Sequence, residues 1–173
     1  LTTDQRGFPR PAVGCDIGSY ELLTGSTRVV AALLPSSRSV QVNTPATAFA
    51  TIINTGQEIA AGCSITPLTS VPASFAYQIT DPATNQVTGF SNTPANIAAG
   101  AAQSFVFAIT PTAPIPSTDV QFNFDCANSD PASINTGLNT LLLSASNTPV
   151  PDIVAMAATT TNDGIVNISG TNG

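Results

Sequence analysis

Two segments of the chain place large apolar side chains at every second position. In SFVFAIT (104–110) the side chains of Phe105, Phe107 and Ile109 share one face, and VQFNFDC (120–126) alternates in the same way. A period of two residues is typical of strands that bury one face. We therefore predict two half-buried strands here, with the aromatic side chains in a hydrophobic core.

Further strands are predicted where short apolar segments lie between turn-forming residues. Their ranges are 29–34, 46–54, 62–67, 74–80, 139–146, 152–158 and 164–168. Turn sequences such as NTGQ, DPATNQ and NSDP separate these segments, and no stretch of a dozen residues carries the 3.6-residue period of a helix. Many short strands joined by such turns favour an all-β fold, which we predict to be an Ig-like antiparallel β-sandwich.

The segments group into three units along the chain. Residues 1–26 are expected to form an N-terminal cap or linker segment, and 27–147 the sandwich itself. Residues 148–173 are expected to form a short C-terminal strand extension or the start of a second sandwich module. Because the sequence starts without Met and stops just after a strand-like segment, we expect both ends to be cuts through a longer chain.

The composition excludes several classes of function. Only 8% of the residues are charged, the net charge is -6, and Lys and His are absent. An acidic chain without lysine does not attract phosphate backbones or anionic lipid, and its apolar runs are too short to cross a membrane, so we expect neither nucleic-acid binding nor membrane insertion. Without His and Lys, a Ser-His-Asp triad and a phosphate-binding loop are both excluded. We predict a protein that is not an enzyme and that binds no cofactor.

The three cysteines indicate an oxidising environment. Cys63 shares the face of Ile65, and Cys126 ends the alternating segment 120–126, so both thiols are predicted to point into the core. We expect a disulfide between them that joins the two sheets, which places the protein outside the cell or on its surface. Two buried free thiols are the alternative. Cys15 is left over and is either an intermolecular thiol or a lone buried one.

Other candidate sites are weaker. Asp125, Asn128 and Asp130 follow a predicted strand and offer oxygen ligands for Ca²⁺, but turn formation by these side chains is the favoured interpretation. No other metal site is predicted. The aromatic side chains that fall outside the strand pattern, and so are candidates for stacking on sugars, are Phe8, Tyr20 and Phe90.

The first 21 residues hold an unusual concentration of charged side chains, within DQRGFPRP (4–11) and CDIGSYE (15–21). This pattern resembles the segment D-x-R-G-x-x-R-P…C-D-I-G-x-x-E that closes right-handed parallel β-helix regions in large bacterial secreted and surface proteins. The resemblance implies that Arg6, Arg10, Asp16 and Glu21 form a structural cap of ion pairs and hydrogen bonds. A binding or catalytic cluster of the same side chains is the alternative.

The remaining chain is similar to the Ig-like, cell-adhesion-related modules of bacterial surface proteins. The similarity rests on Asn54-Thr55-Gly56 and on the Ala99-Gly100 turn before a predicted strand. It implies a noncatalytic spacer, adhesive or assembly module.

We therefore expect a nonenzymatic extracellular module of a stalk, adhesin or filament subunit. Its expected partners are further copies of itself or other surface proteins, joined by β-strand addition through a detached strand from 28–42 or 152–168. A carbohydrate-binding module of a larger secreted protein, with a polysaccharide as ligand, is the alternative.

Overall fold

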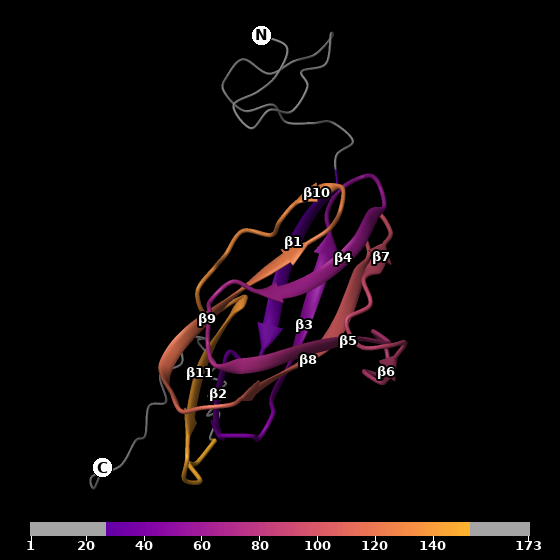
Figure 1. Ribbon diagram of the computed structural model, residues 1–173. Helices are drawn as coiled ribbons and strands as arrows, with labels where there is room; N and C mark the ends of the chain where they lie inside the picture. The colour runs from indigo at the N-terminus through magenta and orange to yellow at the C-terminus, as the bar shows by residue number, and fades with distance from the viewer. Residues whose placement is uncertain (1–26, 153–173) are drawn as a thin grey trace, which may run out of the picture.

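The computed structural model describes residues 27–152, which form strands and no helix (Figure 1). The strands are β1 (Thr27–Leu34), β2 (Ser37–Gln41), β3 (Ala46–Asn54), β4 (Ala60–Pro67), β5 (Ala73–Thr80), β6 (Val87–Thr88), β7 (Ala95–Ile97), β8 (Ala102–Pro111), β9 (Ile115–Asp125), β10 (Ser129–Asp130) and β11 (Thr140–Ser146). The predicted all-β class is confirmed. Asp152 is not in a strand, and the rest of the strands predicted at 152–158 and 164–168 lies outside the described residues.

Two sheets pack face to face. The six-stranded sheet has the order β10-β1-β3-β8-β5-β6, and the five-stranded sheet has the order β2-β11-β9-β4-β7. The seven longest strands fall in the orders β1-β3-β8-β5 and β4-β9-β11. These are the ABED and CFG orders of the immunoglobulin fold, so the predicted Ig-like sandwich is confirmed.

The sheets are not purely antiparallel, because β2 pairs in parallel with β11 and β10 pairs in parallel with β1. β1 leaves the six-stranded sheet at Pro35, which cannot donate to a ladder, and β2 then joins the other sheet. The sequence pattern did not predict β2, since Val40 is its one buried side chain. The short strands β6, β7 and β10 were also missed, because two or three residues carry no period.

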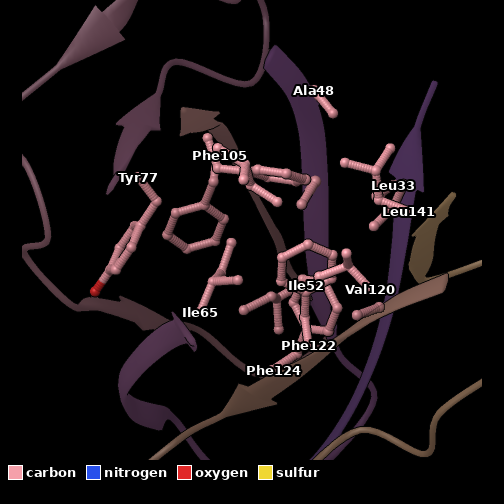
Figure 2. Close-up of a cluster of buried hydrophobic side chains, with 14 of the residues drawn as sticks. Leu33, Ala48, Ile52, Ile65, Tyr77, Phe105, Val120, Phe122, Phe124 and Leu141 are labelled. Atoms are coloured by element: carbon pink, nitrogen blue, oxygen red, sulfur yellow. The ribbon is translucent and has the colours of Figure 1, made fainter. Parts of the chain in front are cut away.

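The core is a layer of aromatic and aliphatic side chains between the sheets (Figure 2). Phe107 on β8 and Phe122 on β9 meet across the layer with ring centroids 5.0 Å apart. Phe75 lies 5.7 Å from Phe107 and 5.9 Å from Phe122, which extends the contact to β5. Each such pair contributes about 0.5–1.5 kcal/mol beyond the burial of its apolar area. The predicted core positions of the aromatic side chains on β5, β8 and β9 are confirmed.

Asn54 is a buried polar residue that joins two turns at one end of the sandwich. It is fully buried at the end of β3, and its Nδ2 lies 2.7 Å from the carbonyl oxygen of Glu58, 3.0 Å from that of Ile97 and 3.2 Å from that of Ala98. Its Oδ1 accepts a hydrogen bond from the backbone N–H of Gly56.

The backbone of Asn54 makes the same connection. Its carbonyl accepts from Gly100 N–H, and its N–H donates to the carbonyl of Ala101. The motifs Asn54-Thr55-Gly56 and Ala99-Gly100 are therefore parts of one hydrogen-bonded unit. Because a buried amide must find partners, this unit fixes how β3 ends and how β8 begins.

We expect Asn54→Asp to lower the free energy of unfolding by about 2–4 kcal/mol, because a carboxylate of the same size cannot donate to the three carbonyls and instead turns a buried negative charge toward their oxygens. Urea denaturation at neutral pH measures the loss. The exposed Asn147→Asp is the control and should change stability by about 0.5 kcal/mol or less. Equal stability of the two variants would contradict this role.

Candidate functional site

Cys63 and Cys126 are joined, with their sulfur atoms 2.11 Å apart. The predicted partners are correct, but the prediction that the bridge joins the two sheets is wrong. Ser64 on β4 lies opposite Asp125 on β9 in the antiparallel register, so the two cysteines face each other on neighbouring strands of the five-stranded sheet. Alternation along each strand indicates that both thiols face the core, but it does not indicate which sheet each strand joins.

Hydrogen bonds fix the chain around this bridge. The register of β4 with β7 shifts between Ala60 and Cys63, and Gly62 has a positive φ of 61° at the shift, a conformation that favours glycine. Gly62 N–H donates to the Asn96 side chain over 2.8 Å. On the other strand, Ala127 N–H donates to the carbonyl of Ala61. The bridge therefore lies in a rigid end of the sheet.

The calcium candidate Asn128 has a structural role instead. Its Oδ1 accepts from Ala61 N–H over 2.8 Å, and its Nδ2 donates to the carbonyl of Ile59 over 2.9 Å. Asp125 is in β9 and Asp130 is in β10. Within residues 27–152, no group of three or more acidic, cysteine or histidine side chains is placed to hold a metal ion.

Most of the other predicted site residues cannot be placed. Cys15, the cap residues Arg6, Arg10, Asp16 and Glu21, and the aromatic candidates Phe8 and Tyr20 lie outside the described residues. Phe90 is described and is 83% exposed, in agreement with its prediction as an exposed aromatic platform.

The loop that carries Phe90 runs from β6, which pairs with β5, to Asn92, and the preceding turn between β5 and β6 is held by Asp81. Asp81 Oδ1 accepts from the N–H groups of Ala83 and Thr84, each over 2.9 Å, and these backbone hydrogen bonds, led by that from Thr84, hold the pKa of Asp81 below its usual value. Beyond Phe90, Asn92 Oδ1 accepts from Tyr77 N–H, and Asn92 N–H donates to the Tyr77 carbonyl. The loop therefore presents Phe90 from fixed ends.

The segment 28–42 is not a detached strand. β1 pairs with β3 along six residues, and β2 pairs with β11 from Ser37 to Gln41. The hydrogen bonds of this segment are satisfied inside its own sandwich, so its donation to a neighbouring chain stays a prediction that would require β1 or β2 to leave these partners. Alternating side chains indicate a strand but do not indicate whose sheet it joins.

The outer edge of β2 is occupied by Asp152. Its Oδ1 accepts from Ser39 N–H over 2.8 Å, and its Oδ2 lies 2.7 Å from Arg38 Nε in an ion pair. Arg38 also donates to the backbone carbonyl of Thr47 on β3. An acidic side chain at this position blocks the addition of another strand to the edge.

The outer face of the five-stranded sheet is polar. Its outward side chains are mostly hydroxyls, amides and carboxylates: Ser37, Ser39, Gln41, Ser64, Thr66, Asp119, Gln121, Asn123, Asp125, Ser144 and Ser146. Leu142 is the one large apolar side chain among the outward positions of β2, β4, β9 and β11. Such a face is typical of a sheet that contacts water.

The outer face formed by β1, β3, β5 and β8 exposes several large apolar side chains among threonine, serine and glutamine. Two cross-strand pairs of large exposed side chains lie on it, Val30 opposite Ile53 and Leu34 opposite Phe49. Phe49 also lies opposite Val106 on β8. We call the surface formed by Val30, Leu34, Phe49, Ile53 and Val106 the apolar outer face. Thr51 and Ser104 lie between its two apolar rows. Exposed apolar side chains that gather on one face mark interaction surfaces.

A cleft of about 320 Å³ opens between the sheets where β4 connects to β5. Leu68 and Val71 of the connection form part of its wall, and the core residues Ile109 and Val120 lie at its base. No charged side chain lines it. Its volume is at the low end for ligand pockets, which suits a small apolar group.

No protein-family model matches the chain, and no curated protein matches it. Residues 27–152 contain no helix that is long and apolar enough to cross a membrane. The features of the sandwich that bear on function are its bridge, its edges and its two different outer faces.

We expect at most one thiol, Cys15, to react with an alkylating reagent in denaturant without reductant, because the other two are bonded to each other. Intact-mass measurement counts the labels. The loop between the bonded cysteines spans 63 residues, so replacing both with Ala should cost about 4 kcal/mol of unfolding free energy in the chain-entropy model. Cys15→Ser is the control, and labelling of all three thiols in the unreduced chain would disprove the bridge.

Proposed function

We propose that the protein is a nonenzymatic structural module of an extracellular or cell-surface protein, which acts as a spacer and assembly unit. One observation carries the proposal: β1 begins at one end of the long axis of the sandwich, and the chain leaves β11 at the opposite end (Figure 1). A domain inserted in this way extends a larger chain by its own length. A domain whose two chain ends lie side by side adds little to the length of the chain.

The pairing of β2 with β11 suits such a module. These strands belong to the first and last parts of the sandwich, and they run parallel over five register pairs. Tension applied through the chain ends pulls parallel strands in opposite directions along their length. Their ladder hydrogen bonds, including those from Leu142 N–H to Ser36 and from Val42 N–H to Ser146, are then loaded together rather than one after another.

The disulfide and the polar outer face support an extracellular location. Structural disulfides persist in oxidising compartments, and Cys63 and Cys126 are both buried in the core. The similarity of residues 4–21 to the closing segment of β-helix regions also favours a bacterial secreted or surface protein, with the sandwich following a solenoid.

We expect the full chain, stretched between its two ends by force spectroscopy, to unfold in one force peak that depends on β2–β11 pairing. Val42→Pro should lower the peak force, because it removes the N–H that bonds to Ser146. Ser91→Pro, in an exposed loop away from these strands, is the matched control and should leave the force unchanged.

The same measurement contains a test of the bridge. With the disulfide intact, the residues between Cys63 and Cys126 cannot extend, so reduction should add about 200 Å to the length released on unfolding. Extension of the oxidised chain without a force peak would contradict a role as a spacer under load.

Polysaccharide binding is the second candidate function. The observation that favours it is Phe90, an exposed aromatic side chain on a loop with anchored ends. Aromatic rings in this setting stack on the apolar faces of sugars.

If this second function holds, Phe90→Ala should abolish retention of the full chain on the polysaccharides that retain the wild type, as measured by affinity electrophoresis. The fold should be unaffected, because Phe90 lies outside the core. Val87→Ala, a neighbouring exposed substitution, is the control. Equal retention of both variants and the wild type would remove Phe90 from any sugar site.

A further inference from the structure

We infer that the apolar outer face of the six-stranded sheet is an interface on which a second copy of this chain packs, face to face, about a two-fold axis. The inference deepens the proposed function, since it names the partner and the surface of an assembly module. Three features support it: the side chains of the apolar outer face, the positions of the charged residues, and the occupation of the β2 edge by Asp152.

Large apolar side chains are exposed on this face, among uncharged polar ones. Antiparallel sheets that face water on one side alternate apolar and polar residues. β1, β3 and β8 place Val30, Leu34, Phe49, Ile53 and Val106 outward in two rows that are separated by Thr51 and Ser104, while their inward positions already fill the core. The sheet therefore exposes large apolar side chains on the face that the five-stranded sheet does not cover.

The charges favour a second copy as the occupant. Apart from Arg28 at its margin, the outward positions of β1, β3, β5 and β8 hold no charged side chain. The five-stranded sheet carries Asp119 and Asp125 outward, so two copies meeting there would bring four carboxylates together. In an acidic protein, the apolar outer face is thus the broad surface on which two copies meet without repulsion between carboxylates.

The geometry also suits self-pairing. An interface about a two-fold axis uses the same patch on both copies, so it must be complementary to itself, and an uncharged apolar surface meets this condition. Rows such as Leu34, Phe49 and Val106 run across neighbouring strands and give each copy ridges that pack between those of the other. Strand addition at β2 is less suitable, because Asp152 occupies that edge.

The test is sedimentation equilibrium of the full 173-residue chain, compared with two variants matched in exposure and charge. Phe49 is 45% exposed on the apolar outer face, and Leu142 is 46% exposed on the opposite sheet. Phe49→Glu should weaken dimerisation at least about 30-fold, because it buries a charge at the centre of the contact. Leu142→Glu adds the same charge elsewhere and should leave the dimer constant within about three-fold. Thermal unfolding of each variant verifies that it is folded.

Each of the other outcomes overturns the inference in a distinguishable way. A dimer that is weakened by Leu142→Glu and not by Phe49→Glu would place the interface on the five-stranded sheet. A monomeric wild type whose thermal midpoint falls much further with Phe49→Glu than with Leu142→Glu would show that this chain's own segments cover the face. A monomeric wild type with an unchanged midpoint would leave the face open to a different partner. None of these results alters the end-to-end stretching behaviour, so the spacer function stands or falls separately.

Discussion

The contact between Phe107 and Phe122 across the two sheets is the interaction on which the rest of the structure depends. These rings belong to β8 and β9, strands of different sheets, and Phe75 extends their contact to β5. A sheet is stable in water only when at least one face is covered, so this layer turns two ribbons of strands into one domain. The placement of the chain ends, the parallel pairing of β2 with β11, and the position of the bridge all follow once the sheets are held together.

The two sheets then differ in how they meet their surroundings. One has a polar outer face with carboxylates at Asp119 and Asp125, and the other exposes large apolar side chains of β1 and β3, with Arg28 as the charge at its margin. This difference between the two outer faces is informative because neither face contributes to the core, which lies between the sheets. It suits a module that is solvated on one side and in contact with a neighbour on the other, and that spans the distance between its chain ends.

The sequence predicted the fold well where the signal was local. Large apolar side chains at every second position in 104–110 and 120–126 predicted β8, β9 and the aromatic core, and turn residues predicted most of the remaining boundaries. Pairing between distant segments left no such local signal. The partners of the bridge were predicted, yet its sheet was not, and β2 was missed because its pairing with β11 depends on tertiary structure rather than on period.

The apolar outer face was readable in principle, since VVAALL in β1 and AFATII in β3 are near-continuous apolar runs that indicate burial on both faces. The role of Asn54 could not be predicted from the sequence, because it depends on the carbonyls of Ile97 and Ala98 lying close to it in space.

The most direct measurement of the central claim is hydroxyl-radical footprinting of the native chain across a dilution series, read by mass spectrometry. The account predicts that Phe49 and Leu34 are oxidised in dilute solution and become protected together as the concentration rises. Phe90 and Leu142, exposed elsewhere, should be oxidised to the same extent throughout. Oxidation of Phe49 that does not change with concentration, or protection that appears at Leu142 instead, would contradict the claim that copies of this protein meet through the apolar outer face.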